Sequence, residues 1–158
     1  MTAQDLPEHA NDLVLTRLFD IPADRLYRCW TEPALIQQWF APSPWSVARV
    51  DNDVRPGGHS LIVMRSPEGQ EMPGSGVYLE VIPNRRLVFT DAFTQGWVPA
   101  DKPFMTGIVT FDPEGSQTRY TARVRHWNAA DRAQHEAMGL HSGWGQCADQ
   151  LAELAARL

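Results

Sequence analysis

The sequence predicts an α+β fold in which a curved antiparallel sheet of about six to seven strands carries a long C-terminal helix over its concave face. Three features indicate this fold. A strand-like segment at residues 12–19 is followed by two short helical segments, strand-like segments separated by turn residues continue up to residue 127, and residues 128–158 contain apolar side chains at helical spacing and no proline. A helix that follows such a run of strands is expected to pack on one face of the sheet.

The chain length indicates a single domain. The 158 residues are 43% hydrophobic and 21% charged, which is typical of a globular protein that buries about two-thirds of its unfolded surface around one core. We therefore expect residues 12–158 to form one domain and the polar residues 1–11 to form a flexible N-terminal tail.

Charge and composition argue against several classes of function. The net charge of −5 is spread along the chain without a lysine- or arginine-rich run, which disfavours a nucleic-acid partner. No apolar stretch is long enough to span a membrane and the N-terminus does not resemble a secretion signal, so we expect a cytoplasmic protein. Cys29 and Cys147 lie far apart, which predicts neither a disulfide framework nor a zinc site.

The N-terminal part is predicted to contain one strand and two short helices. Residues 12–19 are rich in Leu, Val and Thr and end at a turn-forming Asp-Ile-Pro sequence, which predicts a strand. Residues 23–31 carry apolar side chains at helical spacing, and Pro33 forces a break before a second short helix that reaches Trp39.

The middle of the chain is predicted to be a series of antiparallel strands, because clusters of Gly, Pro, Asn and Asp separate short apolar segments. The predicted strands are residues 45–55, 59–65, 72–82, 86–93, 104–111 and 118–127. Pro73, Gly74 and Gly76 interrupt the third of these and indicate an edge position or a β-bulge. A loop rich in turn residues, 94–103, precedes the last two strands.

The last predicted strand alternates clearly between two faces. One face is predicted to be buried and consists of Tyr120, Ala122, Val124 and His126. The opposite face is predicted to be solvated and consists of Arg119, Thr121, Arg123 and Arg125.

The C-terminal segment is predicted to be one continuous helix. Asn128 is a favourable N-cap, and no proline follows it. The apolar stripe is Ala137, His141, Trp144, Ala148, Leu151, Ala155 and Leu158. Gly139, Gly143 and Gly145 each cost a helix interior about 1 kcal/mol relative to alanine. They are explained either by close packing of the backbone or by room for a ligand beside Trp144.

Four groups of residues, in this order, resemble a known family. They are Trp30-Thr31-Glu32-Pro33 with Trp39, Arg55-Pro56-Gly57-Gly58, Gly76–Val81 leading to Arg86–Phe89, and Gly143-Trp144. Residues 12–158 are similar to the branch of the START-like (SRPBCC) superfamily that is named after homologues of the activator of the heat-shock-protein-90 ATPase. The resemblance implies a helix-grip (START/Bet v-like) fold with a deep cavity between sheet and helix, which members use for lipids, sterols, polyketides and plant hormones.

The aromatic and methionine content suits a cavity with apolar walls. The candidate ligand-binding residues are the side chains that we expect to face it: Trp39, Phe40, His59, Met64, Tyr78, Phe89, Phe93, Trp97, Phe104, Tyr120, His126, Met138, His141 and Trp144. For each of them, packing in the core is the alternative explanation. We expect a ligand to enter beneath the loop of residues 94–103 and to lie between Trp144 and the sheet.

Three residues are candidates for acid–base catalysis in this cavity. His126 lies on the apolar face of its strand and His141 on the apolar stripe of the helix, although a hydrogen-bonded buried histidine also explains either position. Glu80 shares a strand face with Tyr78 and could act as a base there, unless a bulge at residues 73–76 turns it outward. No nucleophile elbow, phosphate-binding glycine loop or metal-ligand spacing is present, so we expect no metal and no cofactor.

The sequence leaves three hypotheses for the function. The preferred one is a module that binds a small hydrophobic or amphipathic molecule, because the resemblance and the aromatic content both indicate a cavity. The second is a cofactor-free cyclase or similar enzyme that acts on a polyketide-like or aromatic substrate in that cavity. The third is a protein-binding module that contacts the heat-shock-protein-90 chaperone or forms a homodimer through an exposed sheet edge.

Overall fold

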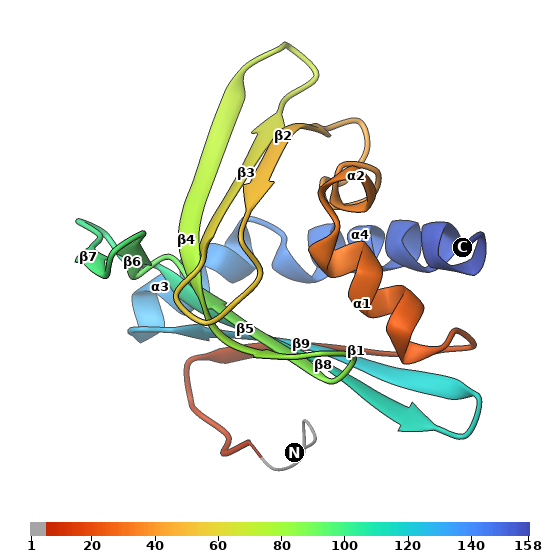
Figure 1. Cartoon of the computed structure of the whole chain (residues 1–158). Coiled ribbons are helices and arrows are strands. Elements are labelled where there is room, and N and C mark those ends of the chain that lie inside the picture. The colour runs from red at the N-terminus through yellow and green to blue at the C-terminus, as the bar shows by residue number, and fades with distance from the viewer. Residues whose placement is uncertain (1–5) are drawn as a thin grey trace.

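The chain folds into a seven-stranded antiparallel sheet with helices on its concave side (Figure 1). The structure is a computed structural model that describes residues 6–158. The strand order in the sheet is β1-β9-β8-β5-β4-β3-β2. The strands are β1 (Asp12–Phe19), β2 (Ser46–Asn52), β3 (His59–Arg65), β4 (Glu71–Ile82), β5 (Arg86–Thr90), β8 (Met105–Glu114) and β9 (Gln117–His126). β6 (Phe93–Thr94) and β7 (Val98–Pro99) form a separate small hairpin.

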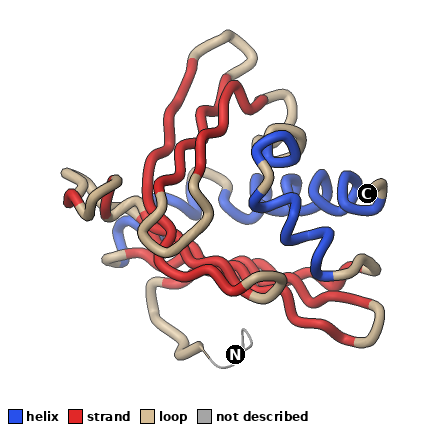
Figure 2. The backbone as a smooth tube through the Cα atoms, in the orientation of Figure 1, coloured by secondary structure: helices blue, strands red, loops and turns tan. Residues whose placement is uncertain are grey.

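Four helices accompany the sheet within the described residues. They are α1 (Ala23–Thr31), α2 (Pro33–Ile36), α3 (Ala129–Ala137) and α4 (Leu140–Ala156). In Figure 2 the helices, drawn in blue, lie between two parts of the sheet, which are drawn in red. The predicted α+β fold is therefore confirmed. The element order differs in two places: the β6–β7 hairpin occurs where a loop is predicted, and the C-terminal segment forms two helices.

The main core lies between α1, α4 and the part of the sheet formed by β1, β9, β8 and β5. Its fully buried side chains include Leu26 of α1, Leu87 of β5, Phe111 of β8 and Leu151 of α4. Burying side chains of this size contributes about 1.5–3 kcal/mol each. The predicted alternation of β9 places Tyr120, like these residues, inside the core.

The rest of the sheet projects away from this core as an arm made of β2, β3 and the first half of β4 (Figure 1). Residues Val77–Ile82 of β4 pair with β5, whereas residues Glu71–Gly76 pair only with β3. The first half of β4 is therefore a free edge, which suits Pro73 because proline has no N–H to donate to a neighbouring strand. The edge position predicted for this segment is confirmed.

The prediction of one continuous C-terminal helix is wrong at a single point. Asn128 caps α3 as predicted, because its side chain accepts a hydrogen bond from the backbone N–H of Asp131 at 2.8 Å. The helix stops at Ala137, and Gly139 has a φ of +89°, a left-handed conformation that interrupts helical hydrogen bonding. A second helix, α4, then begins at Leu140 and packs on the core.

The N-terminal residues that the structure describes contact the sheet. The guanidinium of Arg125 donates a hydrogen bond to the carbonyl oxygen of Pro7, and the backbone N–H of His126 donates to that of Asn11. The first five residues of the predicted tail lie outside the described residues. Across residues 6–158, no helix is both long enough and apolar enough to cross a membrane.

Candidate functional site

Two apolar pockets lie side by side between the arm and the helices. The arm pocket has a volume of about 340 Å³ and is lined mainly by residues 60–64 of β3, residues 72–78 of β4, Phe89 and Thr90. The helix pocket has a volume of about 270 Å³ and is lined mainly by Trp39, Tyr120, His135 and residues 138–147 around the start of α4. Trp30, Phe40 and Met64 line both pockets, so these three side chains form a shared wall.

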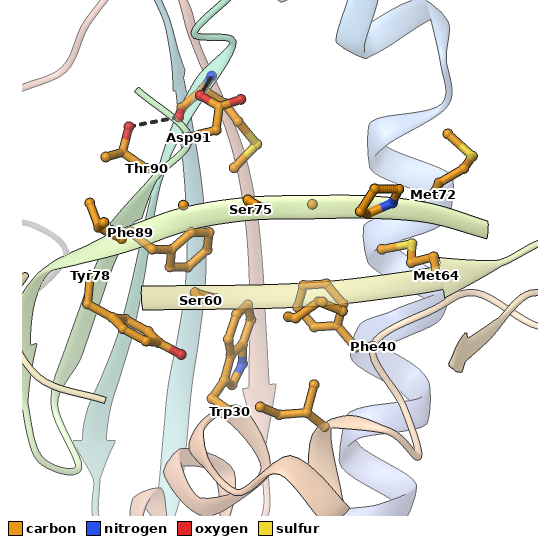
Figure 3. Close-up of a pocket in the computed structure, with 17 residues that line it drawn as sticks. Trp30, Phe40, Ser60, Met64, Met72, Ser75, Tyr78, Phe89, Thr90 and Asp91 are labelled. Carbon is orange, nitrogen blue, oxygen red and sulfur yellow. Dashed lines mark hydrogen bonds between the residues drawn. The ribbon is translucent and has the colours of Figure 1, made fainter. Parts of the chain in front are cut away.

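Small residues create the space of the arm pocket (Figure 3). Gly74 is paired with Ile62 and Gly76 with Ser60 across β3 and β4, so the two glycines occur on the face that points into the pocket. A Cβ atom at Gly76 would lie 2.2 Å from the carbonyl oxygen of Thr90, which leaves room only for glycine. A side chain at Gly107 would collide with the ring of Phe89, another lining residue.

The polar groups around the arm pocket are largely engaged by the protein. The hydroxyl of Tyr78 accepts a hydrogen bond from the side-chain amide of Asn52 at 3.2 Å, and burial raises the pKa of that hydroxyl. A carboxylate oxygen of Asp91 accepts hydrogen bonds from the backbone N–H groups of Phe104 and Met105. The carboxylate therefore accepts hydrogen bonds from the backbone at one end of the pocket. The remaining wall is mainly apolar.

The break between α3 and α4 creates the space of the helix pocket. Gly139, Leu140, Gly143 and Trp144 all line it. A Cβ atom added to Gly143 would have no neighbouring atom within 4 Å, so this glycine faces open space. Of the two explanations for the glycines near Trp144, room beside the pocket applies to Gly143, whereas Gly145 lies close to the Arg17 side chain.

α4 also holds the loop that closes the pocket on the side of α2. The side-chain amide of Gln150 donates hydrogen bonds to the carbonyl oxygens of Trp39 and Ala41 at 2.9 and 2.8 Å. The indole N–H of Trp39 donates to the carbonyl oxygen of Cys29 at 2.8 Å. These bonds fix the shared wall relative to both α1 and α4.

Trp30 brings an unused hydrogen-bond donor to this wall. Its side chain is 6% exposed, and its indole N–H has no hydrogen-bond partner among the described residues. The hydroxyl of Tyr120 lies nearby, and burial raises its pKa well above the usual range. The indole N–H of Trp30 lowers this pKa in part, although it makes no hydrogen bond of normal geometry. The hydroxyl of Tyr120 therefore stays protonated, and both donors are buried in the wall beside the helix pocket.

Two histidines, His126 and His135, form a hydrogen-bonded pair, and His135 lines the helix pocket. Nε2 of His126 lies 2.9 Å from Nδ1 of His135, and Nδ1 of His126 lies 2.8 Å from the carbonyl oxygen of Asn11. His126 is buried and His135 lines the pocket. Burial, together with the neighbouring His126, lowers the pKa of His135 from 6.5 to about 4, so His135 is neutral at pH 7.

The structure brings about half of the predicted ligand-binding residues to the two pockets. Those that line a pocket are Trp39, Phe40, Met64, Tyr78, Phe89, Tyr120, Met138 and Trp144. Those that line neither are His59, Phe93, Trp97, Phe104, His126 and His141. The six residues of this second group do not face either of these two pockets, and their part in ligand binding stays a prediction.

Local contacts explain where the aromatic residues of this second group and His59 lie. Nε2 of His59 bonds to a carboxylate oxygen of Asp51 at 2.9 Å. Phe93 and Trp97 pack on each other in the β6–β7 hairpin, and the Trp97 ring lies against Gly57. Phe104 packs on the ring of His126. No residue of the loop 94–103 lines either pocket, and the entrance expected beneath this loop stays a prediction.

Two of the three candidate catalytic residues point away from the pockets. His141 is exposed, because the break at Gly139 removes it from the stripe on which the continuous helix would have placed it. Glu80 bonds to the Arg86 guanidinium, with 2.9 Å from Nε to the carboxylate oxygen. The register of β4 against β5 shifts between Tyr78 and Glu80, so the bulge lies after residues 73–76 and turns Glu80 to the face opposite Tyr78. The third candidate, His126, is a hydrogen-bonded buried histidine.

Trp30 and His135 are central to the site but are not among the binding residues predicted from the sequence. Trp30 lies in the helical pattern of residues 23–31, and its position in both pockets depends on how α1 packs on the sheet. His135 lies in the segment predicted to be helical, and its pairing with His126 nine residues earlier is a tertiary contact. No group of three metal-ligating side chains is present in residues 6–158. Burial raises the pKa of Cys147, which lines the helix pocket, to about 11, so its thiol stays protonated.

A family model described as activator of Hsp90 ATPase homolog 1-like protein matches residues 20–156. The chain belongs to this family. The family is of the START-like type, and the similar solved structures share the fold seen in Figure 1. No protein of the curated set matches the chain.

Several solved structures are similar to this member of the activator of Hsp90 ATPase homolog 1-like family. A crystal structure of a protein from Nitrosomonas europaea has 41% identity and a TM-score of 0.91, and the match covers 95% of this chain and 97% of that one. A protein from Mycobacterium smegmatis has 26% identity and a TM-score of 0.77, with 90% and 89% covered. A protein from Rhodobacter sphaeroides, at 20% identity and a TM-score of 0.82, with 96% and 97% covered, shows the fold alone.

Proposed function

We propose that this protein binds a small hydrophobic or amphipathic molecule between the sheet arm and the helices. The observation that carries the proposal is the pair of adjoining apolar pockets, about 340 and 270 Å³ in volume, that share the wall of Trp30, Phe40 and Met64. Pockets of roughly 300–1,000 Å³ with apolar walls and few polar groups are typical of small-molecule sites. The START-like family membership supports the same proposal, and we further propose that binding takes place in the cytoplasm.

The polar groups define the chemistry of such a ligand. The indole N–H of Trp30 and the hydroxyl of Tyr120 can donate to an oxygen atom, while the walls otherwise offer aromatic rings and methionines. A largely apolar molecule with one or two polar atoms fits this arrangement. A highly charged ligand does not, because no free charged side chain lines the helix pocket to pair with it.

Native mass spectrometry of freshly purified protein, with extraction and identification of what dissociates, tests this proposal. We expect a stoichiometric apolar adduct, or saturable binding of an added naphthalene-sized probe, that a Trp144→Ala variant loses. Trp127→Ala is the matched control, because Trp127 is 49% exposed and lines neither pocket. A clean protein mass combined with no saturable binding of apolar probes would overturn the proposal.

The family description supports a second candidate function, a contact with the Hsp90 chaperone. Its test is the ATPase rate of purified Hsp90 with and without this protein, together with a direct binding measurement. A rate that rises with saturation supports this function, and an unchanged rate without binding rejects it. The enzyme hypothesis has less support, because Glu80 and His141 point away from both pockets.

A further inference from the structure

The hydrogen bonds of the histidine pair determine which nitrogen atoms carry protons. The carbonyl oxygen of Asn11 can only accept, so Nδ1 of His126 must carry the proton of that 2.8 Å bond. In a neutral His126 ring, Nε2 is then bare and accepts. Nδ1 of His135, 2.9 Å away, must therefore carry a proton and donate it. In a neutral His135 ring, Nε2 is consequently left as a bare acceptor.

The ring that carries this acceptor belongs to a half-buried residue that lines the helix pocket. His135 is in α3 and lines the pocket together with Met138, Leu140 and Trp144. Its Nε2 has no hydrogen-bond partner among the described residues, since the one hydrogen bond of the ring is made through Nδ1. The ring is held in place on its other side by Phe104, whose centroid lies 5.0 Å from that of His135. The His135 ring, which lines an apolar pocket, thus carries an acceptor that has no partner among the described residues.

We propose that the helix pocket selects a cyclic, predominantly apolar ligand whose hydroxyl group donates a hydrogen bond to Nε2 of His135. This inference rests on the proposed function and adds the class of ligand. Aromatic side chains at Trp30, Trp39 and Trp144 favour a flat ring, and the bare nitrogen favours a donor over an acceptor. His126 is a positioning residue, because it orients the His135 ring and sets its tautomer without reaching the ligand.

The first test needs no ligand. NMR of the ring nitrogens, recorded on protein with ¹⁵N-labelled histidine at pH 7.5, reports which nitrogen of each ring is protonated. We expect the Nδ1–H tautomer for both His126 and His135, whereas free histidine in water prefers the other tautomer. An Nε2–H tautomer at His135 would overturn the inference, because that nitrogen could then only donate. Assignment follows from His126→Phe and His135→Phe variants, each of which removes one set of signals.

The second test compares two probes of nearly the same shape, 1-naphthol and 1-methoxynaphthalene. The methoxy compound is the more apolar, so burial alone makes it the tighter ligand. With a hydrogen bond to Nε2 of His135, we expect the wild-type protein to bind 1-naphthol about fivefold more tightly at pH 7.5, measured by calorimetry or fluorescence. His135→Phe is expected to abolish this preference. His141→Phe, which changes an exposed histidine that lines neither pocket, is expected to keep it.

The outcomes separate this inference from the proposed function. Equal binding of the two probes by the wild-type protein, or a preference that survives His135→Phe, overturns the inference and leaves the binding function intact. Failure of both probes to bind counts against the helix pocket as a site at all and so against both proposals. Retention of the wild-type circular dichroism spectrum and melting transition shows that the His135→Phe variant is folded, and if it is not folded, the tautomer measurement on the wild-type protein decides.

Discussion

The two pockets share a wall but are built by different means. The arm pocket is lined by Gly74 and Gly76 of β4, and most of the polar groups around it are engaged by the protein itself. In the helix pocket, space comes from the break at Gly139 and the missing side chain at Gly143, and its polar groups, the indole N–H of Trp30 and Nε2 of His135, lack partners. A buried donor without a partner, such as the indole N–H of Trp30, is costly unless a ligand or water completes it. This difference favours the helix pocket as the part that recognises the polar atoms of a ligand. The arm pocket then offers apolar space for the rest of the ligand.

The largest expected effect comes from removing the shared wall. Trp30→Ala deletes a side chain that packs on Trp39, Phe40 and Phe89, so we expect the free energy of unfolding to fall by about 3–5 kcal/mol. Urea denaturation followed by circular dichroism measures the change. Trp127→Ala, at an exposed tryptophan, should change it by less than about 0.5 kcal/mol. A small loss at Trp30 would mean that the wall is not part of the core.

Filling one pocket at a time shows which of the two pockets determines ligand affinity. Gly143→Leu puts a side chain into open space in the helix pocket, and we expect it to weaken 1-naphthol binding at least about tenfold, about 1.4 kcal/mol. The same change should not destabilise the protein, because a glycine inside a helix costs about 1 kcal/mol relative to alanine. Gly74→Leu fills the arm pocket instead and should leave the affinity within about twofold. If Gly74→Leu has the larger effect on affinity, the roles assigned to the two pockets are reversed.

A change on the face of the sheet that points away from the pockets should affect stability without affecting ligand binding. Glu80→Gln weakens the pairing of Arg86, whose side chain is only 5% exposed, and we expect a loss of about 1–2 kcal/mol because Glu80 itself is 40% exposed. Glu114→Gln, in an exposed pair with Arg119, should cost less than about 0.5 kcal/mol. Denaturation and probe titration together check this. Lost affinity in folded Glu80→Gln protein would contradict the outward position of Glu80.

The last prediction concerns pH and belongs to the helix pocket alone. The pKa of His135 is about 4 in the folded protein, lowered by burial and by His126, against 6.5 ordinarily. Between these values the unfolded chain binds more protons than the folded one, so the contribution of His135 to stability is complete above pH 6.5 and is lost as the pH falls towards 4. Denaturation midpoints at pH 4.5 and 7.5 should therefore differ less in His135→Phe than in the wild-type protein. His141→Phe should retain the wild-type pH dependence, because His141 is exposed.

Much of the fold follows from local sequence patterns. The helical spacing of residues 23–31 and the N-cap at Asn128 each depend on neighbours within a few positions, and each is found as predicted. The alternation of β9 holds for its predicted buried face, whereas Thr121 of the face predicted to be solvated is itself buried. The edge position of Pro73 follows in the same way from the absence of an N–H. Within the site, eight of the fourteen candidate residues line a pocket, because they were chosen by residue type and by a strand or helix face that the structure retains.

Other features were decided only by the tertiary structure. A register shift between Tyr78 and Glu80 turns the carboxylate outward, and the left-handed Gly139 ends α3 and removes His141 from the buried stripe. Each change is confined to one or two residues, but it alters the direction of the side chains that follow. Where those side chains then lie depends on what the segment packs against. The pairing of His126 with His135 and the sharing of Trp30 by both pockets likewise join segments through packing. Most helices and strands, and the apolar face of each, can be predicted from the sequence alone, because they depend on backbone periodicities of 2 and 3.6 residues. Only the tertiary structure decided which polar atoms are left without partners, because that depends on the position of every neighbouring group.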